Sequence, residues 1–268
     1  LAVGKAITTK GCDLRNDDLH ILAGWVSLHS KSEKAAIESL DLSGNGNMLL
    51  DEHGGRPRQA LGWDALCGNL AGDAAWRLDT LNISNCELGI AATKPLAECV
   101  IHLKHLDIVG NTLGTEGMAV VSESLGRANC IETVRVDFGE DGHNVKTLRA
   151  KEQELDLRPG GGPVQDAVPQ NFRACDLALL DAWLSNEQVQ TMALRLDNNR
   201  LEAAAWRAFA GSLSAIHIEK LTVRNCGLTS GALEGLKFPP SLTSLDMAQN
   251  DFTGGWDKFS AALQKTKI

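Results

Sequence analysis

Tyrosine is absent from the 268 residues, and aromatic residues together make up only 4% of the chain. A hydrophobic core must therefore be built from Leu, Ile, Val and Ala, as in proteins made of stacked repeats. No run of about 18 consecutive apolar residues occurs, so the sequence offers no transmembrane helix. Basic residues are not in excess either, because the formal net charge is −8. Binding to a phosphate backbone needs a basic surface, and we therefore expect no nucleic-acid partner.

Paired cysteine motifs are also missing. The seven cysteines are an odd number, are widely spread and form no Cys-x-x-Cys pair. This usage does not indicate the disulfide framework of a small secreted domain, and it favours a reducing, cytoplasmic location. The chain does have a hydrophobic fraction of 43% and a charged fraction of 22%. These proportions predict a folded, packed protein rather than a disordered one.

One pattern, Leu-x-x-Leu-x-Leu-x-x-Asn/Cys-x-Leu, occurs six times. Two copies deviate at one apolar position, where Asn47 and Thr191 stand, and a further segment from Ile131 keeps only the apolar part. Where no insertion intervenes, the fourth positions are spaced by 25, 28, 27 and 24 residues. Such regular self-similarity predicts a repeat protein. The fourth positions are Leu40, Leu81, Leu106, Val134, Leu194, Leu221 and Leu245.

These segments resemble leucine-rich repeats, and the longer units are similar to the ribonuclease-inhibitor type, in which a helix follows each strand. The resemblance covers nearly the whole chain. It implies an α/β leucine-rich-repeat solenoid (horseshoe), with a parallel concave sheet of about nine strands and outer helices. It also implies that the chain is a protein–protein interaction scaffold that binds a partner protein through its concave face.

The physical properties of the pattern agree with this resemblance. Leu-x-Leu is a strand with one buried face, because side chains alternate along a strand. The ninth-position residues Asn111, Asn199 and Asn250 have no apolar reason to be buried. We expect their amide groups to turn inward and form hydrogen bonds with the backbone of the turns. Cys86 and Cys226 occupy the same position, and Cys12 is a further candidate for it.

A helix is predicted after each strand. In the segment from Leu113 to Leu125, Thr115 is a candidate cap, and the apolar residues that follow it share one helix face. Trp63, Trp206 and Trp256 recur at one repeat position. We interpret this recurrence as packing between helices rather than ligand stacking.

The segments Asp18–Trp25 and Asp176–Trp183 match at Asp, Leu, Leu and Trp. We therefore interpret residues 1–268 as a single domain made of two tandem blocks, about 1–138 and 139–268. An irregular first strand opens each block, within residues 6–14 and 154–158. Gly- and Pro-rich stretches near 48–60 and 158–172 are predicted to be loop insertions, either tolerated at the surface or contacting a partner. A further irregular stretch covers residues 138–147.

No motif in the chain indicates catalysis, a cofactor or a metal. The Gly-rich stretches lack the spacing of phosphate-binding loops. His102 and His105 are three residues apart, but they flank the start of a repeat strand and have no third ligand nearby. We expect no enzyme activity, no cofactor and no metal site.

The fifth and seventh positions of each repeat are predicted to form two ladders on the concave side. One interpretation is that their charges form ion pairs on a solvated face, each contributing little stability. The alternative is an interaction surface, since guanidinium groups on rigid strands suit the recognition of carboxylates. The candidate partner-binding residues are Asp41, Asp107, Arg135, Asp137, Arg158, Arg195, Asp197 and Arg224.

The partner is expected to be another protein of unknown identity. An alternative function is regulation of an enzyme, as a GTPase-activating or inhibitor protein. Neither end of the chain shows a polar capping repeat, and the chain begins at Leu1. Repeat arrays normally need such caps. We therefore expect neighbouring sequence or a partner subunit of a larger assembly to cover the ends, unless the terminal helix is itself a sufficient cap.

Overall fold

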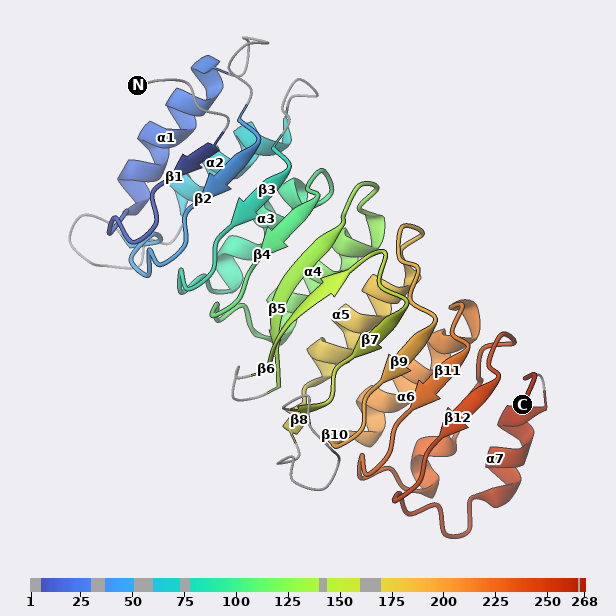
Figure 1. The fold of residues 1–268 in the computed structure, drawn as a ribbon. Helices are drawn as coiled ribbons and strands as arrows, with labels where there is room; N and C mark the ends of the chain where they lie inside the picture. The colour runs from blue at the N-terminus through green and yellow to red at the C-terminus, as the bar shows by residue number, and fades with distance from the viewer. Residues whose placement is uncertain are drawn as a thin grey trace. The chain divides into compact units, whose positions relative to one another are not determined.

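The computed structural model describes residues 6–29, 37–50, 60–72, 78–139, 144–159, 170–264 and 266–268. The chain divides into two compact units, Leu1–Val136 and Asp137–Ile268. In each unit, short strands form one layer and the helices lie together on one face of it (Figure 1).

Unit one is built from strands that follow one another in space as they do in the sequence. They pair in parallel in the order β1-β2-β3-β4-β5. The bounds are β1 (Ala6–Thr8), β2 (Ser39–Asp41), β3 (Thr80–Asn82), β4 (His105–Asp107) and β5 (Thr133–Phe138), with helices α1 (Asn16–His29), α2 (Leu61–Ala71), η1 (Ile90–Ala92), α3 (Thr93–Val100) and α4 (Gly114–Arg127).

The predicted stacking of the repeats is confirmed in unit one. The register places Leu40 beside Leu81, Leu81 beside Leu106, and Leu106 beside Val134. These fourth-position side chains are almost fully buried, as are Leu42 and Ile83 at the sixth position. The alternation of Leu-x-Leu therefore gives each strand one buried face, as expected for a strand covered by helices on one side.

Unit two contains a four-stranded parallel sheet of order β7-β9-β11-β12 and a separate parallel pair of β8 and β10. Leu155, Leu194, Leu221 and Leu245 stand side by side across the larger sheet. The bounds are β6 (Asn144–Arg149), β7 (Glu154–Asp156), β8 (Gln170–Phe172), β9 (Ala193–Arg195), β10 (Asn199–Leu201), β11 (Lys220–Thr222) and β12 (Ser244–Asp246), with helices α5 (Ala174–Ser185), α6 (Ala203–Ser212), η3 (Leu213–Ala215), η4 (Ser230–Leu233) and α7 (Trp256–Leu263).

The strands are divided among separate sheets, so one continuous sheet of nine strands is not what the structure describes. The predicted horseshoe stays a prediction. The expected opening strands of both blocks are present as β1 and β7.

Two stretches that were expected to be irregular contain strands. Residues 170–172, within the expected loop insertion at 158–172, form β8, and its Phe172 stacks on Phe138 with ring centroids 5.3 Å apart. In the stretch 138–147, β6 begins at Asn144 and buries Leu148. Apolar anchors therefore give both stretches a packed side. Residues 140–143 and 160–169 lie outside the described residues.

The ends of the expected insertion at 48–60 are packed, because Met48 and Ala60 are buried. Residues 51–59 of this insertion lie outside the described residues.

The outer helices bury the recurring tryptophan at two of its three positions. Trp63 and Trp206 are almost fully buried, and the Trp63 indole donates to the carbonyl of Ala92. Trp256 is 66% exposed, so its predicted packing between helices is wrong. It stands at the start of α7, and in the described part of the chain no later helix follows to cover it. Thr115 is not a cap either, since α4 has no side-chain capping bond.

Candidate functional site

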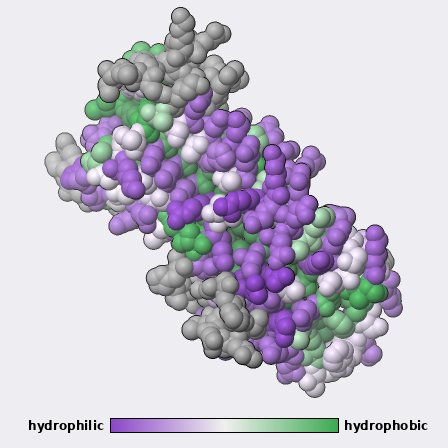
Figure 2. Space-filling model, viewed as in Figure 1, coloured by the Kyte–Doolittle hydropathy of each residue, from purple (hydrophilic) through white to green (hydrophobic). Residues whose placement is uncertain are grey.

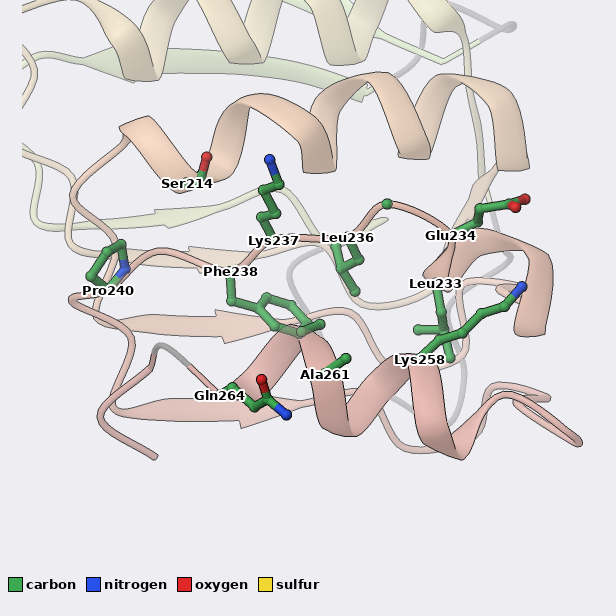
Figure 3. Close-up of a pocket in the computed structure, with 12 residues that line it drawn as sticks. Ser214, Leu233, Glu234, Leu236, Lys237, Phe238, Pro240, Lys258, Ala261 and Gln264 are labelled. Carbon is green, nitrogen blue, oxygen red and sulfur yellow. The ribbon is translucent and has the colours of Figure 1, made fainter.

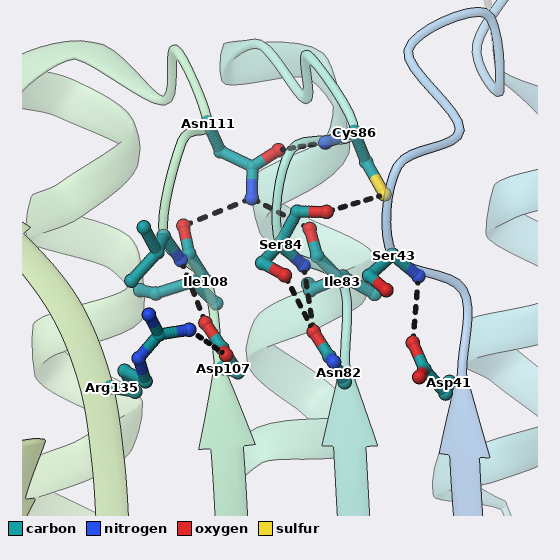
Figure 4. Close-up of polar contacts among 11 residues, drawn as sticks. Asp41, Ser43, Asn82, Ile83, Ser84, Cys86, Asp107, Ile108, Asn111 and Arg135 are labelled. Carbon is teal, nitrogen blue, oxygen red and sulfur yellow. Dashed lines mark hydrogen bonds and ion pairs between the residues drawn. The ribbon is translucent and has the colours of Figure 1, made fainter. Parts of the chain in front are cut away.

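A ladder of ninth-position side chains joins the turns that follow the strands of unit one. The Asn111 amide nitrogen donates to the carbonyls of Ile83 and Ile108, at 2.8 and 2.9 Å. Its side-chain oxygen accepts from the backbone N–H groups of Cys86 and Leu88, at 3.2 and 3.0 Å (Figure 4). One half-buried amide thus satisfies four backbone groups of two neighbouring turns.

The same ladder recurs in unit two. Asn250 donates to the carbonyls of Val223 and Met247 and accepts from the N–H groups of Cys226 and Leu228. The predicted inward turn of Asn111, Asn199 and Asn250 is therefore confirmed. In both units the order along the ladder is Asn, Cys, Asn, formed by Asn45, Cys86 and Asn111 and by Asn199, Cys226 and Asn250.

The thiols at this position behave as small donors. The sulfur of Cys86 lies 3.1 Å from the Leu42 carbonyl, and that of Cys226 lies 3.3 Å from the Leu196 carbonyl. Cys12 follows Ile7 as Asn45 follows Leu40, so it holds the same register. It is nevertheless exposed, because in the described chain no strand precedes β1 to cover it.

Most fifth-position side chains close the end of their own strand. The side-chain oxygen of Asp41, Asn82 and Asp107 accepts from the backbone N–H two residues later, at 2.9, 3.0 and 3.1 Å (Figure 4). Asp156 and Asp246 do the same in unit two, at 3.0 Å each. Sequence reasoning missed this role, although an Asp or Asn that bonds the backbone two residues on is a known turn signal.

Where the fifth position holds an arginine, the guanidinium bridges to the preceding strand. Arg135 lies 2.6 Å from Asp107, and Arg195 lies 2.7 Å from Glu154. The seventh-position arginines also find carboxylates. Arg158 folds back onto Asp156 at 2.6 Å, and Arg224 approaches Asp246 at 3.5 Å.

Two of the aspartates expected to bind a partner are buried or half-buried. Asp197 is only 4% exposed and accepts from the Arg224 N–H at 2.8 Å and from the Thr222 hydroxyl at 3.0 Å. Asp137 is half-buried, and its carbonyl accepts from the Arg173 guanidinium.

The four candidate arginines keep more of their side chains exposed than Asp197 does. The side chains of Arg135, Arg195 and Arg224 are 46%, 40% and 37% exposed, whereas that of Arg158 is 19% exposed. In each unit, the exposed side chains at the fifth and seventh positions of the repeats form a surface that we call the strand face. Hydrophilic residues gather over the strands in Figure 2. The strand face is therefore polar, internally paired and held on rigid backbone.

The pairing on this face shifts proton affinities. Burial alone would raise the pKa of Asp156, but the hydrogen bonds from Arg158 outweigh it and lower the pKa below the ordinary 3.8. The hydrogen bond to Asp156 in turn raises the pKa of Arg158. Both groups are charged at neutral pH.

Among the described residues, no cluster of His, Cys, Asp and Glu has the make-up of a metal site. His105 is placed on its strand by a 2.9 Å hydrogen bond between its Nδ1 and the Thr133 hydroxyl. Within the same part of the chain, none of the helices has the length and apolar character needed to cross a bilayer.

A family model described as Leucine Rich repeat matches residues 101–122, which contain β4 and α4 as far as Ser122. No curated protein matches the chain. The match supports a leucine-rich-repeat family, whose domains generally serve as protein-interaction modules.

Proposed function

We propose that this chain is an interaction scaffold of the ribonuclease-inhibitor-like repeat type, which binds a partner protein through its strand face. The observation that carries the proposal is the exposure of Arg135 in unit one and of Arg195 and Arg224 in unit two. Arg135 and Arg195 stand on the parallel strands β5 and β9, Arg224 lies two residues after β11, and each keeps more than a third of its side chain exposed. Arginines are enriched among the residues that dominate protein–protein binding energy.

The ion pairs of these arginines orient them without removing them from solvent. Exposed pairs contribute about 0–1 kcal/mol each. A partner carboxylate can therefore replace Asp107 or Glu154 at small cost. Because the guanidinium is held on rigid backbone, little conformational entropy is lost on binding. We infer that the acceptor on the partner is a carboxylate-bearing surface.

The roles of the candidate residues then differ. Arg135, Arg195 and Arg224 contact the partner, with Arg158 contributing through its exposed edge. Asp41, Asp107 and Asp197 position the strand ends and the arginines, since their oxygens accept backbone N–H groups. Asp137 belongs to the half-buried margin of the face.

The test replaces Arg195 and Arg224 together by glutamate. The matched control is Arg207→Glu on α6, whose side chain is 43% exposed and lies in the helical layer. Proteins captured by the wild type and by Arg207→Glu should be lost with Arg195→Glu/Arg224→Glu, while helix content and Tm stay unchanged. If the double variant captured as much partner protein as the wild type, the strand face would not be the binding surface.

We further propose that binding, not catalysis, is the role of this chain, and that it works in a reducing compartment. All seven cysteines are free, and five of them are buried. Burial raises the pKa of Cys226 to about 12 and also raises that of Cys67, so these thiols stay protonated and serve packing. Stimulated GTP hydrolysis in a panel of small GTPases would favour the alternative of an enzyme regulator.

A further inference from the structure

A cavity of about 690 Å³ opens in the helical layer of unit two. It lies between η3, which follows α6, the segment that follows η4, and α7 (Figure 3). This layer is opposite the strand face, so the cavity is separate from the surface proposed above to bind a protein.

The cavity exists because one repeat is short. Only 24 residues separate Leu221 from Leu245, and the four-residue η4 stands where the other repeats of this unit place a helix. One side of the space beside η4 is closed, because Gly255 packs tightly against Ser230. A Cβ on Gly255 would lie 2.9 Å from the Ser230 Cβ. The rest stays open because the chain from residue 234 to 240 has no helix to fill it.

The walls of the cavity are apolar and already ordered by packing. Leu233, Leu236, Phe238 and Ala262 line it and are at least nine-tenths buried. The Phe238 ring packs edge-on against Phe259 of α7, with centroids 6.3 Å apart. The walls are therefore held in place before any ligand enters.

Two lysines stand at the rim. Figure 3 shows Lys237 reaching towards α6, while Lys258 extends from α7 on the opposite side. Neither forms an ion pair with a residue that the structure describes, whereas the rim residue Glu234 faces Arg207 at 3.8 Å. The rim is thus locally positive in a chain with a net charge of −8.

We propose that this cavity binds a small apolar molecule bearing one carboxylate, such as a medium-chain monocarboxylate. Small-molecule sites are concave, mostly apolar spaces of about 300–1,000 Å³ with a few placed polar groups. The apolar part contacts Leu233, Leu236 and Phe238, and the carboxylate lies at the positively charged rim. An acidic peptide is the other occupant that this rim charge would attract.

The test measures binding by isothermal titration of the whole chain with dodecanoate, kept below its micelle concentration. Dodecyltrimethylammonium and dodecanol carry the same tail with a positive or no charge. We expect dodecanoate to bind at least about tenfold more tightly than either, because charge complementarity is lost for both. Similar affinity for all three would overturn the proposal by showing unspecific adsorption.

Two variants locate the binding. Lys237→Glu/Lys258→Glu should weaken dodecanoate binding by roughly tenfold or more, since two attractive charges become repulsive. Ala261→Trp, at an exposed position of α7 that lines the cavity, should block it. Lys220→Glu on β11 is the matched control and should bind like the wild type. Unchanged dodecanoate binding in both cavity variants would refute a monocarboxylate site. Binding of an acidic peptide but not of dodecanoate in the same titration would refute it too.

Discussion

At the scale of single residues, Asn111 and Asn250 form equivalent hydrogen bonds in the two units. Each amide donates to carbonyls of two neighbouring turns and accepts from two backbone N–H groups, which leaves no orientation other than the one observed. The donors must face Ile83 and Ile108, because carbonyls can only accept. Asparagine is therefore required at this position for its combination of donor and acceptor.

Asn111→Asp should reveal that requirement. The carboxylate keeps its acceptor role but faces two carbonyl oxygens, so we expect a loss of about 2–4 kcal/mol in the free energy of unfolding. Urea denaturation at neutral pH measures this loss. Gln188→Glu makes the same change of amide to acid at an exposed position and should stay within about 0.5 kcal/mol of the wild type.

Asp181 on α5 is half-buried and accepts a hydrogen bond from the Ser212 hydroxyl of α6. Burial raises its pKa, and the bond from Ser212 only partly offsets this. The folded state therefore favours the protonated form. Stability is lost as the pH rises from the ordinary pKa of 3.8 through the raised folded value.

Asp181→Asn removes this penalty and still accepts from Ser212. The variant should be more stable than the wild type at pH 7, and its advantage should shrink as the pH falls towards 4. Urea midpoints of both proteins at pH 7, 5 and 4 check the trend. An advantage that grows on acidification would contradict the sign.

The residues that sequence reasoning found are those fixed by the repeat period. The Asn and Cys ladder follows from position nine alone. The backbone hydrogen bonds of the fifth-position aspartates could not be predicted. An Asp at an exposed strand position has the same sequence signal whether it accepts from its own backbone or binds a partner. In the structure, Asp41 and Asp107 accept local N–H groups.

At the scale of elements, Gly62 explains how closely α1 and α2 approach. Its N–H donates to the Asn16 side chain at 2.9 Å, and a Cβ there would lie 1.9 Å from the Asn16 carbonyl oxygen. Backbone cannot yield as a flexible side chain can. The spacing of the two helices is therefore set by the absence of a side chain.

Gly62→Ala should destabilise the protein by about 3 kcal/mol through this overpacking. Gly68→Ala provides the control, because it lies in the same helix and its Cβ would meet nothing within 4 Å. It should stabilise by roughly 0.5–1 kcal/mol through the higher helix propensity of alanine. Thermal unfolding of both variants tests the pair, and a loss of similar size at both positions would argue against the helix contact.

Strands and helices with the full repeat pattern could be predicted, and those without it could not. β8 and β6 contain no Leu-x-Leu motif, and their order comes from the stacking of Phe172 on Phe138 and from buried Leu148. Such anchors act between segments that are distant in sequence. The sequence also could not distinguish the short η4 from a full helix, because a shortened repeat keeps the same apolar spacing.

At the scale of the whole molecule, two units carry the same ladder and the same helix opening. The N–H of Arg15 donates to Asp18 in unit one, and that of Arg173 donates to Asp176 in unit two. The expected tandem duplication was inferred from the sequence match between these two helices, and it stays a prediction. Neither period nor composition indicates which partner the strand faces bind, since binding depends on side chains that the repeat leaves free.

Neighbouring repeat strands lie in register in both units, and the proposed strand faces depend on this register. Thr80→Cys/His105→Cys and Ala193→Cys/Lys220→Cys place thiols on register partners. Strands lie about 4.8 Å apart, within the range of about 4.4–6.8 Å for disulfide-linked Cα atoms. In Thr80→Cys/Asp107→Cys the thiols are offset by two residues, which puts them about 8 Å apart and beyond reach.

Oxidation with copper phenanthroline, followed by mass spectrometry of the cross-linked peptides, is the most direct measurement. We predict disulfides in both register pairs and none in the offset pair. A disulfide in the offset pair, or none in the register pairs, would contradict the stacked arrangement from which the proposed binding face follows.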